Sequence, residues 1–327
     1  MLKYCIKRIL LSLLILLGVS LILYVLVRLM PADYLLDKAI ASVGSTGGDV
    51  QARYEELKAY YGLDGNIIQG YWDWLTKFLS GDFGTSFKYN RPVEDVIFEN
   101  MGVSFGISLV ALVLELLIAI PLGIKCACNQ YGKLDYTVTV ITMIGISFPT
   151  FFLGSIVIKI FAIDLGWFEV GGLQSNLPVG ASDWTQFTDM LWHLVLPMFT
   201  LVVLSIGSWM RYTRTNTLEV LNADYIRTAR AKGLSENSVV YKHVFRNTLI
   251  PLVTVLAGTL PSLFGGAMIT ETVFDIPGIG NIAYNAMRAG DIPFIMGYNM
   301  FIAVLTVIGI LLTDIMYAVV DPRVKLA

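Results

Sequence analysis

The sequence predicts an all-α protein that crosses a membrane several times. Of its 327 residues, 56% are hydrophobic and 15% are charged, whereas a soluble domain carries roughly 25% charged residues. The apolar residues gather into runs of about 20, the length that a helix needs to cross the hydrocarbon core. The net charge of −2 supplies no basic field for nucleic acid. These observations exclude a soluble enzyme, a secreted disulfide scaffold and a disordered regulator.

Six segments are long and apolar enough to span the membrane. They are Ile9–Met30, Gly102–Ile124, Tyr136–Phe161, Leu191–Met210, Leu249–Met268 and Gly297–Val320. The first follows three basic residues and could be mistaken for a signal peptide. Its apolar run exceeds the usual signal-peptide core of about 7–15 residues, and no small-x-small cleavage site follows it. We therefore expect a retained transmembrane helix in residues 1–30.

The positions of lysine and arginine orient these spans. If the N-terminus is cytoplasmic, 14 of the 23 basic residues fall on cytoplasmic segments. Neither lysine nor arginine occurs between Ile160 and Met210. The segment Pro31–Met101 carries 11 acidic and 6 basic residues. Because basic residues concentrate on the cytoplasmic side of membrane proteins, the sequence predicts that both termini are cytoplasmic.

Two connections between spans are too long to be simple turns. Residues 31–101 are rich in glycine turn signals and in aromatic residues, which favours a small extracytoplasmic subdomain or a loop packed on the bundle. Residues 211–248, between the fourth and fifth spans, are strongly basic. We expect an N-terminal transmembrane helix (1–30), an extracytoplasmic subdomain (31–101) and a five-helix core (102–327) that includes the loop 211–248.

The basic loop has the pattern of a helical hairpin on the cytoplasmic face. Asp224 could cap a first helix, Gly233 would end it, and a second helix would begin after Ser235. The apolar faces would be formed by Tyr225, Ile226 and Ala229 in the first helix and by Val239, Val240, Val244 and Phe245 in the second. A basic amphipathic loop can also lie on anionic lipid, and charge alone favours that interpretation.

The residue order of this loop resembles the signature of ABC importer permeases of the oligopeptide, dipeptide and nickel branch. The resembling run extends from Asp224 to Ser235. In the general importer motif a Glu-Ala-Ala triplet precedes the glycine, and a proline follows at a fixed distance. Here the triplet positions hold Arg227-Thr228-Ala229, and the proline position holds Arg246. Both departures are of a kind expected in one of the two permease subfamilies of this branch.

Short runs in family order extend the resemblance over nearly the whole chain. They are Arg28–Asp33, Gly81–Ser86, Arg91–Val93, Ser147–Phe151, Leu165–Phe168, His193–Pro197, Glu271–Phe274, Pro277–Gly280 and Asp321–Arg323. Each run is weak evidence alone. Because they occur together and in order, the chain is identified as a member of this family.

The resemblance implies one subunit of a heteromeric importer in a prokaryotic plasma (inner) membrane. Its partners would be a second homologous permease, two ATPase subunits, an extracytoplasmic substrate-binding protein and membrane lipid. The chain contains no P-loop motif, so ATP and Mg²⁺ would be bound by the ATPases. This chain is expected to be non-catalytic, with no cofactor and no metal of its own.

In this family the hairpin would be the coupling helix that docks in a groove of an ATPase subunit. Its candidate residues are Asp224, Arg227, Ala229, Arg230, Lys232, Gly233, Leu234, Ser235 and Glu236. Gly233 permits a turn closed to bulkier residues, and Ala229 and Leu234 would offer apolar contact. The three cations would meet an acidic rim and set the orientation of docking.

The substrate and the translocation path are less constrained by the sequence. No His/Cys cluster indicates a metal, so di- or oligopeptides are the leading substrates. Nickel or an oligosaccharide is the alternative within the family, and a stand-alone carrier or sensor is a remote one. Charged residues in spans are functional candidates, so Glu115 and Glu271 are candidates for the path, although a structural role is open for both. Glycines and prolines within spans are expected to serve close packing and kinks.

Overall fold

The computed structural model describes residues 2–29, 32–44, 48–60, 65–178 and 180–320. These residues are overwhelmingly helical, and the β-type pairing among them is an isolated bridge between Thr85 and Pro92. The family-like run Asp321–Arg323 and part of the run Arg28–Asp33 lie outside the described residues.

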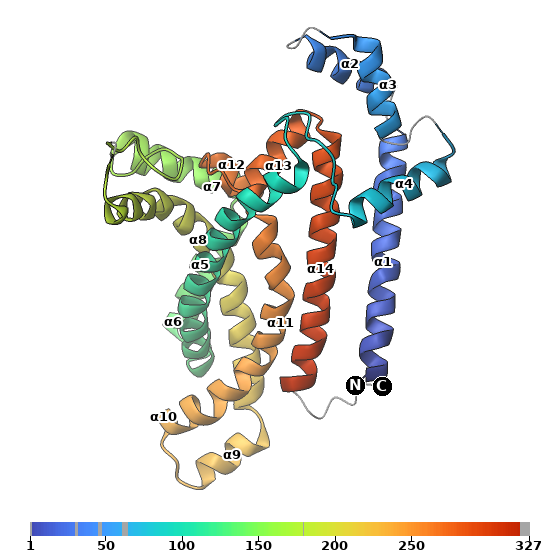
Figure 1. Cartoon of the computed structure of the whole chain (residues 1–327). Coiled ribbons are helices and arrows are strands. Elements are labelled where there is room, and N and C mark those ends of the chain that lie inside the picture. Colours follow the sequence, from blue (N-terminus) through green and yellow to red (C-terminus); the bar gives the residue numbers. More distant parts are fainter. Residues whose placement is uncertain (1, 30–31, 45–47, 61–64, 179, 321–327) are drawn as a thin grey trace. The chain divides into compact units, whose positions relative to one another are not determined.

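Figure 1 shows the order of the helical elements. They are α1 (Leu2–Arg28), α2 (Ala32–Val43), α3 (Val50–Tyr60), α4 (Ile67–Leu79), α5 (Val93–Cys128), α6 (Lys133–Ser147), α7 (Thr150–Val157), the π-helical segment η1 (Ile158–Asp164), α8 (Asp183–Leu221), α9 (Asp224–Ala231), α10 (Glu236–Ser238), the π-helical segment η2 (Val239–Val244), α11 (Phe245–Gly265), α12 (Met268–Val273), α13 (Ile279–Arg288) and α14 (Ile292–Val320). The described residues form two compact units. Unit 1 comprises residues 1–101 and 282–311, and unit 2 comprises residues 102–281 and 312–326.

The long apolar helices confirm the all-α membrane class. Among the described residues, four helices are long and apolar enough to cross a membrane: α1, α5, α8 and α14. There are also two bent helix pairs, Lys133–Ser147 with Thr150–Asp164 and Glu236–Leu256 with Gly258–Val273. If each pair is one span, the number of spans rises to six. The predicted number of six spans therefore depends on counting each bent pair once, and the orientation of the spans stays a prediction.

The third predicted span is not one continuous helix. The helix α6 ends at Ser147 and α7 begins at Thr150, with a bend of 100° between the two parts. Phe148 is extended, with φ −80° and ψ 132°. The ring of Pro149 clashes with the helical conformation of the preceding residue, which accounts for the break at this point. The sequence predicts only a kink here, so the bend is larger than predicted.

Two helices run well beyond the predicted spans. The helix α5 has 36 residues and α8 has 39, whereas spans of about 20 residues suffice for the hydrocarbon core. The segment 213–220, predicted as the start of the basic loop, is the last part of α8. The helix therefore continues beyond the hydrocarbon core of the membrane, because polar residues end a membrane span but do not end a helix.

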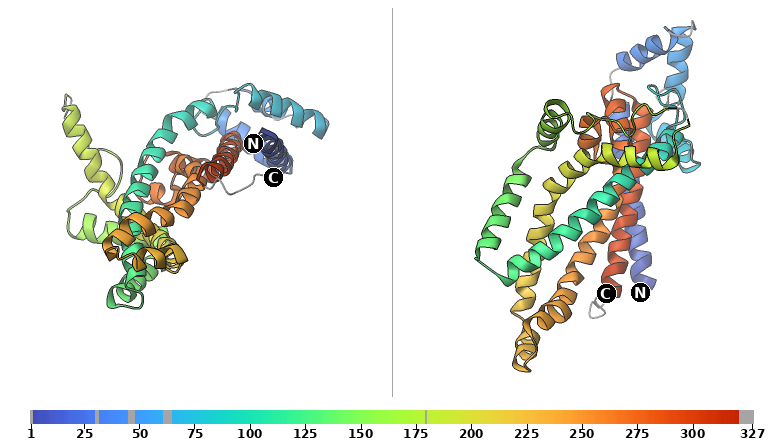
Figure 2. Two further views of the ribbon diagram at one scale, coloured as in Figure 1. Left: turned by 90° about the horizontal axis from the view of Figure 1, so that it is seen from below. Right: turned by 90° about the vertical axis from the view of Figure 1, so that its left-hand side faces the viewer.

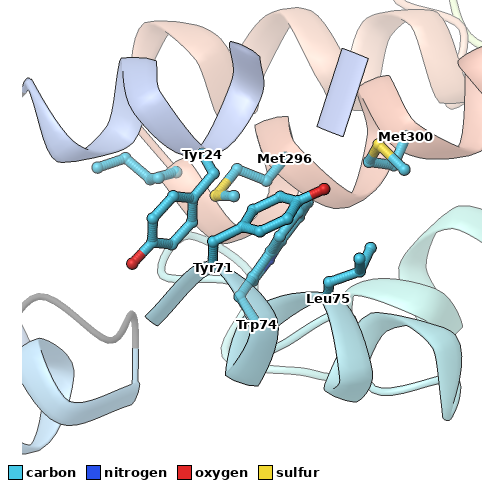
Figure 3. Close-up of a cluster of buried hydrophobic side chains, with 7 residues drawn as sticks. Tyr24, Tyr71, Trp74, Leu75, Met296 and Met300 are labelled. Carbon is cyan, nitrogen blue, oxygen red and sulfur yellow. The ribbon is translucent and has the colours of Figure 1, made fainter. Parts of the chain in front are cut away.

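Unit 1 is organised by an aromatic cluster (Figure 3). Tyr24 on α1 and Tyr71 and Trp74 on α4 pack with Met296 and Met300 on α14. The Tyr24 and Tyr71 rings meet edge to face, with centroids 5.7 Å apart, an arrangement that aromatic quadrupoles favour. The aromatic residues of segment 31–101 thus order α4, as their abundance predicted.

Unit 2 is held together by close approach of α8 to its neighbours. A Cβ atom at Gly123 would lie 2.8 Å from the Met210 carbonyl oxygen, and one at Gly145 would lie 2.9 Å from that of Val203. These glycines serve close helix packing, as expected. By contrast, a Cβ at Gly102 or at Gly106 meets no atom within 4 Å, so within this chain these two do not form a packing motif.

Candidate functional site

The basic loop forms a hairpin at one end of unit 2. The helix α8 enters it, α9 and α10 form its two arms, and η2 leads from it into α11. Figures 1 and 2 show α9 and α10 at the lower tip of this unit. The hairpin is thus presented on two long helices.

The first arm begins one residue earlier than predicted. Ala223 is the extended cap residue of α9, and no side chain caps it. Asp224 lies in the first turn, where a negative charge is stabilised by the helix dipole. Its backbone carbonyl accepts a hydrogen bond from Thr228 Oγ1 at 3.0 Å. The acidic residue therefore favours the start of the helix, but through the dipole and not through a cap.

The turn between the arms depends on a glycine. Gly233 has φ +78°, a conformation that side chains with a Cβ rarely adopt. No atom lies within 4 Å of where its Cβ would be, so the requirement is for backbone conformation and not for space. Ser235 then caps α10, accepting from the backbone N–H of Ser238 at 3.4 Å. The predicted roles of Gly233 and Ser235 as turn and start residues agree with this geometry.

The hairpin has its own apolar core. Ile226, Ala229, Val239 and Val244 are buried and pack against residues at the end of α8. Tyr225, predicted to share this face, is 50% exposed. Ala229 is 7% exposed, so its methyl group stabilises the hairpin and does not lie on the surface that a partner would touch.

Two ion pairs lie within the hairpin. The Arg230 guanidinium donates to both carboxylate oxygens of Glu236 across the turn, and this hydrogen bonding lowers the pKa of Glu236 below its ordinary value. Arg227 lies 3.5 Å from the Asp224 carboxylate. Both pairs are exposed, so water and salt screen them and they contribute little to stability. Lys232, also exposed, has no ion pair among the residues that the structure describes.

The outward surface of the hairpin combines apolar and basic side chains. Leu234 is 41% exposed, Tyr225 is 50% exposed and Tyr241 is 67% exposed. Tyr241 was not among the residues predicted from the sequence. Its position supplied a signal, because it falls between Val239 and Val244, which are both buried, and is therefore off the buried face.

Glu271 lies at the other end of unit 2, on α12 (Figure 1). Its side chain is 1% exposed and is held by three donors. Oε1 accepts from Ser104 Oγ at 2.7 Å and from the Ala267 N–H at 2.9 Å, and Oε2 accepts from the Asn281 N–H at 3.1 Å. Ser104 Oγ in turn accepts from the Ile279 N–H at 2.8 Å. We call these five residues the Glu271 knot.

Glycines allow the chain to close around this carboxylate. A Cβ at Gly278 would lie against the Glu271 carboxylate and 2.5 Å from Ser104 Oγ, and one at Gly280 would lie 2.7 Å from the Cα of Met268. The Gly-Ile-Gly run therefore needs its glycines because the backbone approaches the carboxylate closely. With three hydrogen-bond donors on its carboxylate and its side chain buried, Glu271 is suited to fix the loop between α12 and α13.

Glu115 is a second buried carboxylate, in the middle of α5. It is 6% exposed, and the side chains of Ser205 and Trp209 on α8 lie beside it. It also lines a cavity of about 210 Å³ in unit 2. The structure thus places the two predicted path residues in different settings and brings neither to the hairpin. Among the described residues, no three His, Cys, Asp or Glu side chains are placed to hold a metal ion.

The chain matches two protein families along its length. Residues 119–326 match the family described as the binding-protein-dependent transport system inner membrane component. Residues 1–110 match the family described as the N-terminal part of the membrane component of such systems. Together the two matches cover nearly all of both units.

Individual proteins agree with these matches. The chain is 38% identical over 331 residues to the oligopeptide transport system permease protein AppB of Bacillus subtilis (strain 168), covering 99% of this chain and 100% of that protein. It is 33% identical over 327 residues to the dipeptide transport system permease protein DppB of the same organism, covering 100% and 99%. A solved structure of the MetNI methionine ABC transporter in an inward-facing conformation is similar in fold, with a TM-score of 0.52 at 20% identity, covering 69% of this chain and 96% of that chain.

Proposed function

We propose that this chain, which belongs to the family of binding-protein-dependent transport system inner membrane components, takes part in the import of di- or oligopeptides. The chain is the permease subunit of an ABC importer and an inner membrane protein with several apolar helices. Full-length similarity to an oligopeptide permease and to a dipeptide permease supports a peptide cargo. The cargo would pass along a path that this chain shares with a second permease.

The mechanism depends on the hairpin. Its arms are held together by an apolar core and by an ion pair across the turn, so the hairpin can move as a rigid body. Leu234, Tyr225 and Tyr241 would enter a groove of an ATPase subunit, and Lys232 with the other exposed cations would meet an acidic rim. Closure of the ATPases would move the hairpin and with it α8 and α11. The spans would then alternate between inward- and outward-facing states, a shift between two conformations of different ligand affinity.

The chain would do no chemistry of its own. It lacks the G-x-x-x-x-G-K-[ST] sequence that cradles nucleotide phosphates, so two partner ATPases would bind ATP with Mg²⁺. A second permease, an extracytoplasmic substrate-binding protein and membrane lipid would complete the assembly. The predicted orientation, with both termini in the cytoplasm, would put the hairpin on the ATPase side. Nickel or an oligosaccharide is the second candidate cargo, and a stand-alone carrier or sensor is the remote one.

Peptide uptake by the native host tests the cargo. Deleting this gene should abolish uptake of a labelled tripeptide, and the wild-type gene should restore it. Mild crosslinking followed by purification of the tagged chain should recover a second permease and P-loop ATPases. Unchanged peptide uptake with loss of nickel uptake would instead identify the metal. Recovery of this chain crosslinked only to itself would contradict the importer.

A pair of glycine variants tests the coupling. Gly233→Asp should abolish uptake while the protein remains in the membrane, because an aspartate disfavours φ +78° and puts a negative charge where the proposed rim is acidic. Gly180→Asp is the matched control, since Gly180 is exposed, has φ +90° and has no atom within 4 Å of its Cβ position. Equal uptake by both variants would refute the assignment of the hairpin to the ATPase.

A further inference from the structure

A cavity of about 210 Å³ lies among α5, α8 and α11 within unit 2. Pockets that hold drug-sized ligands measure roughly 300–1,000 Å³, so this cavity is suited to one chemical group of a ligand and not to a whole oligopeptide. Its polar lining residues are Ser108 and Glu115 from α5, Trp209 from α8, and Thr259 and Ser262 from α11. Among the residues that the structure describes, neither lysine nor arginine lines it.

The carboxylate on the cavity wall has unused acceptor capacity. The side chains of Ser205 and Trp209 lie beside Glu115, and an ionised carboxylate offers about four acceptor positions. A charged group within a membrane span is costly unless it faces the interior or a cavity and has a partner. These two side chains can satisfy at most about half of the acceptor positions, so a further donor in the cavity would stabilise the carboxylate.

The hydroxyl groups of the cavity also present acceptors. Thr259 Oγ1 donates its proton to the Leu256 carbonyl oxygen at 2.8 Å, and Ser262 Oγ donates to the Thr259 carbonyl oxygen at 2.6 Å. With these protons engaged, the oxygens of both side chains remain free to accept. Trp209 also lines the cavity. The polar part of the lining thus includes a carboxylate and hydroxyl acceptors, with an aromatic side chain beside them.

We propose that this cavity binds a primary ammonium group of the transported peptide, with Glu115 as its counter-ion. An ammonium group carries three donors and no acceptor, which matches a lining of acceptors without a competing cation. This inference rests on the proposed function, since it concerns the same cargo. The group could be the N-terminal ammonium or the side-chain ammonium of a lysine, because both have the same chemistry.

Transport of matched peptides tests the site in the complete importer. Proteoliposomes containing both permeases, both ATPases and the binding protein would carry either wild-type chain or Glu115→Gln. Three tripeptides would be compared. The first has a free N-terminus and a norleucine, so it carries only the α-ammonium. The second is N-acetylated and has a lysine, so it carries only the side-chain ammonium, and the third is N-acetylated with a norleucine and carries neither. Each variant rate is divided by the wild-type rate for the same peptide, so that the preference of the binding protein cancels.

The substitution should lower uptake by about tenfold or more for peptides that carry the recognised ammonium, since a hydrogen bond between charged groups is lost. Uptake of the peptide without any ammonium should stay at the wild-type rate. A loss for the free N-terminus alone assigns the site to the α-ammonium, and a loss for both amine-bearing peptides assigns it to either amine. Glu169→Gln, which removes an exposed carboxylate of a loop, should leave all three rates unchanged.

Two results would overturn the proposal in distinguishable ways. An equal change for all three peptides, or no change for any, would refute an ammonium site while leaving peptide import in place. No peptide uptake by the wild-type assembly would refute the proposed cargo and the site together. The thermal midpoint of Glu115→Gln, measured in the same preparation, should match the wild type, which excludes loss of folding as the cause of a selective loss.

Discussion

Glu271 and Glu115 are two carboxylates buried in the same unit, and their surroundings differ in kind. Glu271 receives three hydrogen bonds, two of them from backbone N–H groups, and is enclosed by glycines. Glu115 lies beside two side chains of α8 and lines a cavity. A carboxylate with three donors from different segments ties these segments together, whereas one with acceptor positions open to a cavity can bind a ligand. Burial of a charge in a membrane protein therefore does not by itself indicate the translocation path.

The same substitution at both positions should separate the two roles most strongly. Glu271→Gln replaces one acceptor oxygen with an NH₂ group that faces a donor, so the variant should lose about 3 kcal/mol of stability. The thermal midpoint of the purified complex should fall by about 6–12 °C. Full stability of this variant would show that the Glu271 knot does not hold the fold.

A methyl group inside the Glu271 knot should have the next largest effect. Gly278→Ala puts a Cβ against the carboxylate and Ser104 Oγ, and relief of such overlap costs about 2 kcal/mol. Gly102→Ala is the matched control, because its Cβ meets nothing within 4 Å. Thermal unfolding of the two variants side by side measures the difference. Equal thermal midpoints would mean that the loop between α12 and α13 can shift to accommodate the methyl group at no measurable cost in stability.

Removal of the bridging hydroxyl should cost less. Ser104→Ala deletes a donor to Glu271 and leaves the buried Ile279 N–H without its acceptor, which should destabilise the protein by about 1.5 kcal/mol. The control is Ser155→Ala, whose exposed hydroxyl bonds only the Phe151 carbonyl of its own helix. A midpoint that falls for Ser155→Ala as much as for Ser104→Ala would contradict the bridging role.

Glu115→Gln should have the smallest effect on stability, within about 0.5 kcal/mol of the wild type. An amide can still interact with the Ser205 and Trp209 side chains beside it, and removing the charge lowers the cost of burial. Its thermal midpoint should therefore match the wild type even where its transport of amine-bearing peptides does not. A fall as large as that of Glu271→Gln would place Glu115 among the structural residues.

Local patterns in the sequence predicted a substantial part of this fold. The apolar runs predicted the membrane helices, and Pro149 marked the bend of the third span, although the break of 100° exceeded the expected kink. Gly233 and Ser235 predicted the turn of the hairpin, since both act on their immediate neighbours. The start of α9 was misplaced by one residue and Tyr225 was assigned to the wrong face, because the end of a short helix depends on how it packs.

The membrane class, the approximate spans and the hairpin were predictable from the sequence, because they follow from hydrophobic length and from backbone conformations set within a few residues. The family resemblance in the sequence was confirmed by the matches along the whole chain. The fold was needed to show which buried glutamate ties chain segments together and which lines a cavity. Ser104 and Glu271 are 167 positions apart, and Glu115 meets its partners from a different helix. Whether a carboxylate binds the chain or a ligand depends on donors that only folding brings within hydrogen-bonding distance.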